Sequence, residues 1–309
     1  MNTEKVSVIG AGNVGALLAL RIVEHDLADV VLVDIDEGIA KGKAYDLADA
    51  SAIMGYEKKV EGTADYSKIS DSSVVVITAG FPRKPGMSRE DLIQKNGAVV
   101  KEVTLKIKEF APDAVILVVT NPLDIMTYLA YKVSGFDYKK VIGMAGVLDS
   151  ARQSNLISEE LNIMKTEVDS VIIGSHDDNM VPLLNYSKAQ GMPLKKVAVE
   201  NKINEIMEGA KKRGAEIVSL LKSGSAFFAP SAGCFYMVKC ILNNEHLTMC
   251  ASTYLSGEYG LREICIGVPI VLGKNGAEKI IQLDLDTDER EKFQKAAGLI
   301  KSAIEKLNF

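Results

Sequence analysis

The sequence predicts an α/β protein, in which a doubly wound parallel sheet is followed by an α+β second half. Short apolar runs alternate with amphipathic helical stretches up to about residue 145, and that pattern then gives way to longer alternating strands and helices. Apolar runs separated by helices are typical of parallel βαβ units, whose strands are buried on both faces. With 309 residues, 47% of them hydrophobic, the chain is long enough for two domains.

The first half, residues 1–145, contains the expected parallel strands. They are Val6–Ile9, Val30–Val33, Val74–Thr78, Ala114–Val119 and Val141–Met144. The intervening helices are expected to run through Glu24, through about Ala50, and from about Ser88, where Glu90 and Asp91 suit a first helical turn.

The second half, residues 146–309, mixes helices with alternating strands. Helices are expected at 148–160, 201–222, 228–243 and from about 287, and strands near 167–173, 247–255 and 262–271. The boundary carries no flexible linker, so we expect the two halves to pack tightly.

A glycine motif, Gly10-Ala11-Gly12-Asn13-Val14-Gly15, joins the first strand to the first helix. Its glycines suit a tight turn, close approach to a pyrophosphate and close helix–strand packing, in that order. The helix N-terminus stabilises phosphates. Asp34 ends the second strand, where an acid accepts hydrogen bonds from a ribose diol and repels a 2′-phosphate. We therefore expect a Rossmann domain that binds NAD rather than NADP, although a structural turn with an incidental Asp is the alternative.

His176, in Gly174–Pro182, is one of only three histidines. Imidazole titrates near neutral pH and is suited to taking a proton from a hydroxyl. A lone histidine is more often structural. His25 ends the first helix, where a cation suits the dipole, and His246 lies in a turn, so neither is assigned to catalysis.

Two further groups suit a 2-hydroxy acid. Asp149 and Arg152 are spaced to share one helical face, so Asp149 can orient His176 and Arg152 can clamp a carboxylate. A surface ion pair is the alternative. Asn121 follows a strand, at the sheet edge where doubly wound proteins bind ligands.

The segment Ala79–Arg89 is expected to be a loop, because glycines and prolines interrupt it. Arg83 and Arg89 frame it. Such a loop can close over an anion and expel water, and a solvated basic loop is the alternative.

Over nearly its whole length the chain resembles the NAD-dependent malate dehydrogenases of the lactate-dehydrogenase-like type. The resemblance rests on five motifs in the family's order, which are Gly10–Gly15, Arg83–Arg89, Val119–Asp124, Gly143–Arg152 and Gly174–His176. It implies an NAD-binding domain over 1–145, a catalytic domain over 146–309 and reversible oxidation of malate to oxaloacetate in the tricarboxylic acid cycle.

The resemblance also implies residue roles. His176 would be the proton acceptor, Asp149 its partner, and Arg152 the grip on the C1 carboxylate. Arg89 would polarise the keto oxygen and Asn121 would contact the substrate.

Further implied roles concern specificity and the cofactor. Arg83 would pair with the distal carboxylate, where a lactate enzyme has an uncharged side chain. Asn96, Val119 and Thr120, with Asn121, would line the nicotinamide side of the NAD site.

Two further features of the sequence bear on the predicted substrate site. The family has Gly after the histidine, but this chain has Asp177. If its carboxylate points inward it should raise the pKa of His176, with a modest effect on the pH profile. Ser225 and Ala226 are small enough to leave room for a four-carbon diacid.

The composition limits the kinds of binding partner and the location that we expect for the protein. The net charge of −5 and the lack of a basic run argue against nucleic acid. We see no signal peptide and no membrane-spanning run. The four cysteines show no metal-ligand spacing and should be buried thiols, so we expect a cytoplasmic enzyme without a metal.

Assembly and rival functions remain open. A homotetramer or homodimer is expected, with the helices near 37–50, 148–160 and 201–243 as candidate interfaces. Alternatives to malate dehydrogenase are L-lactate or another 2-hydroxy acid dehydrogenase, and an NAD-sensing protein without catalysis.

Overall fold

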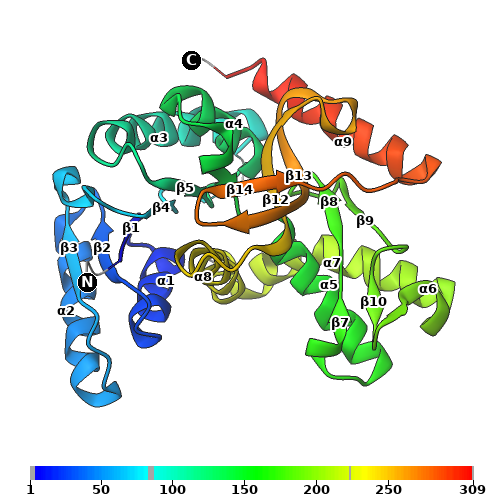
Figure 1. Ribbon diagram of the computed structural model, residues 1–309, viewed down its shortest axis with the longest axis horizontal. Coiled ribbons are helices and arrows are strands. Elements are labelled where there is room, and N and C mark those ends of the chain that lie inside the picture. The colour runs from blue at the N-terminus through cyan, green and yellow to red at the C-terminus, as the bar shows by residue number, and fades with distance from the viewer. Residues whose placement is uncertain (1–3, 83–86, 223, 308–309) are drawn as a thin grey trace.

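A continuous mixed sheet with helices on both faces forms the centre of the molecule (Figure 1). The computed structural model describes residues 4–82, 87–222 and 224–307, with Arg89 described by its backbone only. Within these residues the sheet has eleven strands. Their order is β3 (Val60–Thr63), β2 (Asp29–Val33), β1 (Lys5–Ile9), β4 (Val74–Ile77), β5 (Val115–Val118), β6 (Val141–Gly143), β12 (Leu247–Ser256), β13 (Arg262–Gly273), β8 (Ile172–Gly174) and β9 (Met180–Pro182), with β14 (Gly276–Ile280) paired to β13.

The helices cover this sheet and extend the second half. They are α1 (Asn13–Glu24), α2 (Glu37–Met54), α3 (Arg89–Phe110), α4 (Leu123–Ser134), α5 (Gly146–Leu161), α6 (Leu194–Val197), α7 (Glu200–Leu221), α8 (Phe228–Leu242) and α9 (Thr287–Ile304). Short 3-10 turns are η1 (Tyr66–Ile69), η2 (Tyr138–Lys140), η3 (Lys165–Glu167) and η4 (Glu258–Gly260). A small second sheet contains β11 (Met192–Pro193), β10 (Lys188–Ala189) and β7 (Val168–Asp169).

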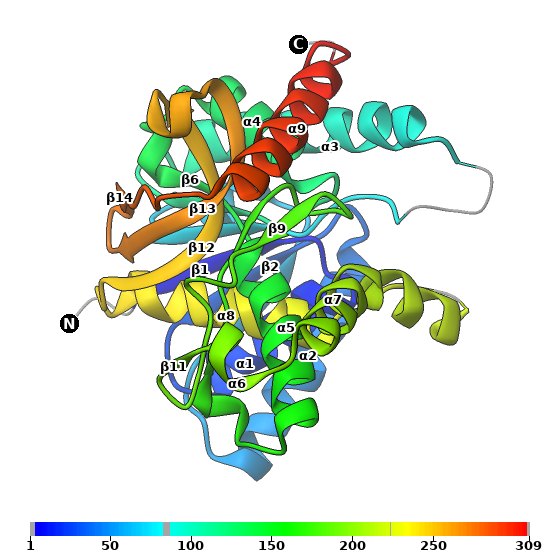
Figure 2. The ribbon, with the colours of Figure 1, turned by 90° about the vertical axis from the view of Figure 1, so that its right-hand side faces the viewer.

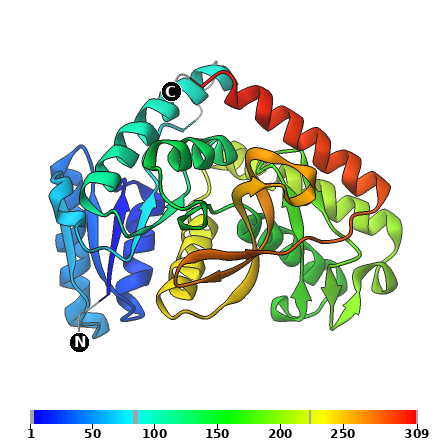
Figure 3. The same cartoon turned by 45° about the horizontal axis from the view of Figure 1, so that its top comes forward.

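The first six strands of the large sheet are all parallel, as the alternation of apolar runs and helices predicted. Helices α1 and α2 lie on one face of this part and α3 and α4 on the other (Figure 3). β1, β4 and β5 are buried almost throughout, because helices cover both of their faces. The Rossmann arrangement is therefore present.

The two halves share one sheet and one core. β6 pairs antiparallel with β12 through Gly143 and Ser252, which lie on opposite sides of the predicted boundary. A single buried apolar cluster also runs through both halves. Helix α8 packs on α1, and α9 lies beside α4 (Figure 2). The halves thus pack tightly, and their division after residue 145 stays a prediction.

Helix termini follow local sequence signals. Ser88 accepts a hydrogen bond from the Asp91 amide, and the Asp91 side chain accepts one from the Ser88 amide, so α3 begins where expected. Asp286 and Glu289 form the same reciprocal arrangement at α9.

Some elements differ from the expectation. The predicted strand near 167–173 is two short strands, β7 and β8, which belong to different sheets. β3 and β14 were not predicted, because both carry polar or glycine residues and lie at the sheet's margins. All four cysteines are buried free thiols. Among the described residues, no helix combines the length and apolarity needed to cross a membrane.

Candidate functional site

The turn between β1 and α1 requires two of its glycines. Gly10 has φ +107°, and a Cβ there would lie 2.7 Å from the Ala79 backbone nitrogen. A Cβ on Gly15 would lie 2.0 Å from the Gly10 carbonyl oxygen. The first glycine therefore makes the turn and the last allows α1 to approach β1 closely.

Gly12 differs from them because a Cβ there would meet no described atom within 4 Å. Gly12 is also the N-cap of α1, and among the described residues no side chain caps that terminus. Open space in front of uncapped amides fits a pyrophosphate, which would accept their hydrogen bonds. Ala11, Asn13 and Val14 complete this turn.

Asp34 lies directly after β2 and faces the glycine turn. Its Oδ2 accepts a hydrogen bond from the Ala11 amide at 2.7 Å, and its Oδ1 accepts one from the Asp36 amide at 3.0 Å. A carboxylate has about four acceptor positions, so further hydrogen bonds from a ribose diol can be accepted. These residues together fit NAD.

The predicted nicotinamide-side residues tie together the loops that follow β4 and β5. The buried Asn96 accepts a hydrogen bond from the Phe81 amide and donates to the Asn121 carbonyl at 2.6 Å. Thr120 donates to the Ala79 carbonyl at 2.7 Å, and the Val119 amide donates to the Ile77 carbonyl. The carboxyl edge of the sheet is thereby fixed at this point.

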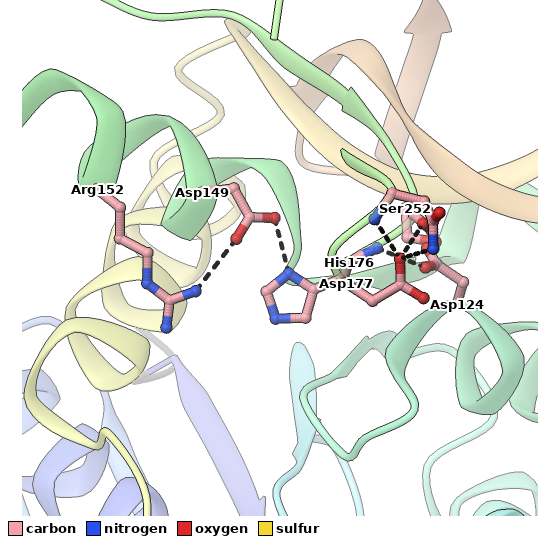
Figure 4. A network of polar contacts seen from close by, with 8 residues as sticks. Asp124, Asp149, Arg152, His176, Asp177 and Ser252 are labelled. Carbon is pink, nitrogen blue, oxygen red and sulfur yellow. Dashed lines mark hydrogen bonds and ion pairs between the residues drawn. The ribbon is translucent and has the colours of Figure 1, made fainter. Parts of the chain in front are cut away.

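His176, Asp149 and Arg152 form a linked group (Figure 4). His176 Nδ1 lies 2.7 Å from Asp149 Oδ2, and Arg152 Nη1 lies 3.4 Å from Asp149 Oδ1. An ionised carboxylate only accepts hydrogen bonds, so Nδ1 carries the proton and Nε2 is the free base. Asp149 is only 2% exposed, which excludes the alternative of a surface ion pair.

The charges of this group act on one another. Burial opposes a charged imidazole, but the Asp149 carboxylate, its hydrogen bond and Asp124 outweigh burial, so the pKa of His176 is raised. Burial lowers the pKa of Arg152, against the attraction of Asp149 and with the help of nearby Arg213. The imidazole is thus a stronger base than usual, next to a cation.

A cavity of about 260 Å³ opens beside the group. Its lining includes Asn121, Asp149, Arg152, His176, Asp177, Asp178, Lys211, Ser225 and Ala226. A second cavity, of about 310 Å³, adjoins it through Asn121 and His176 and reaches Leu92 and Ile300. The site can therefore hold a small anion between a neutral base and a guanidinium.

Two arginines, Arg83 and Arg89, were also predicted to contact the substrate. Arg83 lies outside the described residues, and Arg89 is placed only as the first residue of α3. Their predicted contacts with substrate stay predictions.

Asp177 turns its carboxylate toward its own loop. Oδ1 accepts hydrogen bonds from Ser175 Oγ at 2.6 Å, the Asn179 amide at 2.8 Å and Asn179 Nδ2 at 2.9 Å. The residue takes no left-handed conformation, so it needs no glycine-like freedom. Its charge raises the pKa of Asp124.

Sequence reasoning missed Asp124, which contacts the histidine, and Ser252, which contacts Asp124. Asp124 accepts a hydrogen bond from the His176 backbone amide at 2.8 Å, and Ser252 Oγ donates to the same carboxylate at 2.7 Å. A lone acid in the apolar stretch Leu123–Ala130 was the available signal. Its partners are 52 and 128 residues away along the chain.

A Rossmann half joined to a histidine–aspartate–arginine group, with the aspartate buried, defines the class of NAD-dependent dehydrogenases. Residues 4–143 match the family model of the lactate/malate dehydrogenase NAD-binding domain, and residues 146–308 match that of the α/β C-terminal domain. The chain belongs to the lactate/malate dehydrogenase family.

Proteins named malate dehydrogenase and proteins named lactate dehydrogenase are both similar to the chain. A malate dehydrogenase of Staphylococcus carnosus is 47% identical over 98% of this chain and 99% of its own. The crystal structure of a Cryptosporidium parvum malate dehydrogenase has a TM-score of 0.95 at 38% identity, covering 98% of each chain. A C. parvum lactate dehydrogenase, solved with lactic acid and nicotinamide adenine dinucleotide, has a TM-score of 0.95 at 36% identity over 99% of this chain and 98% of its own.

Proposed function

We propose that the chain is an NAD-dependent malate dehydrogenase that interconverts (S)-malate and oxaloacetate. The observation that carries the proposal is the buried group at the cavity, in which one carboxylate, Asp149, contacts both the base His176 and the cation Arg152. The full-length relative of S. carnosus bears the name malate dehydrogenase.

The cofactor is held by the Gly10–Gly15 turn and by Asp34. When bound, NAD accepts the hydride that leaves C2 of the hydroxy acid. The free space at Gly12 and the Asp34 carboxylate, which faces the glycine turn, support this placement. Asn96, Val119, Thr120 and Asn121 then line the nicotinamide side, at the carboxyl edge of the sheet.

The proton and the substrate carboxylate are handled by the buried group. His176 Nε2 accepts the C2 hydroxyl proton, since Nδ1 already donates to Asp149. Asp149 stabilises the imidazolium that results. Arg152 pairs with the C1 carboxylate through two parallel hydrogen bonds, while Asn121 contacts the substrate and Ser225 and Ala226 leave space for it.

Arg89 polarises the keto oxygen in the reverse reaction, and Arg83 pairs with the distal carboxylate. The sequence motif Arg83–Arg89, whose last residue begins α3, supports both roles. Pyruvate would leave the Arg83 guanidinium without a partner in a closed site.

Lactate dehydrogenase is the second candidate, because the C. parvum lactate enzyme has the same fold. The test is the ratio of kcat/KM for oxaloacetate and pyruvate, followed by NADH absorbance. We expect a preference of about 30- to 4000-fold for oxaloacetate, equivalent to about 2–5 kcal/mol for an unpaired buried charge. Arg83→Gln should lower this ratio, mainly because kcat/KM for oxaloacetate falls. A ratio near one in the wild type would refute the assignment, and no turnover of either acid would favour an NAD-sensing protein.

We further propose a homodimer or homotetramer that acts in the cytoplasm, in the tricarboxylic acid cycle. Exposed apolar side chains on α2, among them Tyr45, Ile53 and Met54, support an interface there. The four unpaired thiols are typical of a reducing compartment. Size-exclusion chromatography with light scattering distinguishes monomer, dimer and tetramer.

A further inference from the structure

The loop that carries His176 is attached to the body of the protein by a buried carboxylate with no place in the proposed proton transfer. Asp124 stands in the first turn of α4. Its Oδ2 accepts a hydrogen bond from the His176 amide at 2.8 Å, and its Oδ1 accepts one from Ser252 Oγ at 2.7 Å (Figure 4). Three segments, α4, the loop after β8, and β12, therefore meet at this one side chain.

The burial of this carboxylate is costly. Asp124 is 5% exposed and Ser252 is fully buried. Burial raises the pKa of Asp124 to about 6, although the hydrogen bonds from His176 and Ser252 act in the opposite direction. An isolated buried carboxylate is strongly destabilising, and an uncharged residue of similar shape would avoid that cost. A role beyond stability is therefore indicated.

The geometry indicates that this role is to hold the backbone of His176 in place. The hydrogen bond goes to the backbone of His176, whereas Asp149 contacts the ring, so the two acids act on different parts of one residue. Asp124 fixes where the ring is attached and Asp149 fixes how it is turned. A misplacement of a catalytic group by about 1 Å is enough to lower a rate about 100-fold.

We propose that Asp124, anchored by Ser252, is a positioning residue for His176, and that its negative charge adds to that of Asp149 in favouring the imidazolium. The inference rests on the proposed role of His176 as the proton acceptor. Asp124 lines the second cavity, but in the proposed function it neither accepts the substrate proton nor pairs with a substrate carboxylate.

Other charged groups around the imidazole act in both directions. In the described part of the chain they are Asp149 and Arg152 from α5, Asp124 from α4, Asp177 and Asp178 from the histidine's own loop, and Lys211 from α7. Of these, Asp149 and Asp124 raise the pKa of His176 and Arg152 lowers it. The effect of Asp124 must therefore be measured by changing it alone.

Asp124→Asn separates the charge from the hydrogen bonds. The amide oxygen can still accept from the His176 amide, and the amide nitrogen can donate to Ser252 Oγ. We expect the pKa of His176 to fall by about 1 unit, because one nearby negative charge is lost. The value of kcat for malate oxidation above that pKa should stay within about threefold of the wild type.

Asp124→Ala removes both the charge and the contacts. It should lower kcat about 10- to 100-fold at every pH, because the histidine loop loses its attachment. KM and NADH affinity should change little. Ser252→Ala leaves one carboxylate oxygen without its donor, and it should lower kcat less than Asp124→Ala does.

The readout that does not depend on turnover is NMR titration of 13C-labelled histidine. The chain has only three histidines, and loss of one signal in His176→Asn assigns the resonance. His246, which is paired with Glu278 at 3.0 Å, serves as the internal control. Asp288→Asn, on the exposed side of α9, is the matched variant and should leave titration and activity unchanged.

The outcomes separate the two proposals. An unchanged His176 titration in Asp124→Asn would overturn the charge effect, and wild-type kcat in folded Asp124→Ala would overturn the positioning. If Asp124→Ala does not fold, wild-type kcat in Ser252→Ala together with an unchanged titration in Asp124→Asn would overturn the inference. A wild type that oxidises no 2-hydroxy acid, but whose His176 titration still responds to Asp124→Asn, would refute the proposed function alone.

Discussion

Asp149→Asn is the substitution that best tests how the histidine is activated. The exchange keeps the size of the side chain and removes its charge. In one orientation the amide oxygen still accepts a hydrogen bond from His176 Nδ1. In the flipped orientation the amide nitrogen donates to Nδ1, so the ring proton lies on Nε2, which then cannot accept the substrate proton. Both orientations weaken His176 as a base.

The size of the effect follows from the geometry. The His176 Nδ1 to Asp149 Oδ2 distance is 2.7 Å and the carboxylate is buried. Two charges whose centres lie about 4 Å apart interact by about 4 kcal/mol at an effective dielectric constant of about 20. The dipole of the Asn amide retains part of this attraction, so we expect a net loss of about 2–3 kcal/mol. That corresponds to a fall of about 1.5–2.2 units in the pKa of His176 and of about 30- to 150-fold in kcat/KM.

The assay is steady-state NADH absorbance between acidic and alkaline pH in both directions. Malate oxidation needs the neutral imidazole, so it is lost as the pH falls through the pKa of His176. Oxaloacetate reduction needs the imidazolium, so it is lost as the pH rises through that pKa. Because the pKa is raised in the wild type, Asp149→Asn should move both limbs to lower pH. KM for malate should rise as well, since Arg152 loses its partner.

Asp288→Asn supplies the control for the same exchange at an exposed position. If the pH–rate profiles of Asp149→Asn do not shift in either direction and kcat/KM stays close to the wild-type value, the Asp149 carboxylate does not activate the imidazole.

The remaining predictions concern the cofactor and the histidine loop. Gly12→Val should keep the melting temperature but weaken NADH binding about tenfold or more, or ~1.4 kcal/mol, as measured by NADH fluorescence; unchanged affinity would contradict the pyrophosphate placement. Gly15→Ala should instead lower the melting temperature, by overlap with the Gly10 carbonyl that costs about 1–3 kcal/mol, and an unchanged melting curve would argue against that close packing. Asp34→Ser should reduce the preference for NADH over NADPH about tenfold in a comparison of kcat/KM, and an unaltered preference would dismiss the ribose contact. Asp177→Gly should change the pH profile only modestly, because that carboxylate bonds within its loop; loss of malate oxidation at every pH would disprove this.

The local parts of the fold and the cofactor end could be predicted from sequence. Buried parallel strands are apolar runs, and the β1–α1 turn uses glycines for steric reasons that act between near neighbours. Asp34 was predictable because its position relative to the turn follows from strand geometry. By contrast, β3 (Val60–Thr63) carries no apolar run, since it lies at the edge of the sheet.

The candidate site was only partly predictable, because its residues come from distant segments. Helical spacing placed Asp149 and Arg152 on one face, but the contact of Asp149 with His176 depends on how α5 packs beside β8. Asp124 stood out only as a lone acid in an apolar stretch, and Ser252 had no local pattern. Their contact exists because α4 packs against β12 across the predicted boundary.

The role of His176 can be tested with one sample of the His176→Asn variant. Two quantities are measured: the single-turnover rate of NADH oxidation by oxaloacetate, and the dissociation constant of NADH. We predict a loss of about 100- to 10,000-fold in the rate, the usual contribution of general acid–base catalysis, with NADH affinity unchanged. Turnover near the wild-type rate, with or without weaker NADH binding, would contradict the assignment of this histidine as the group that moves the proton.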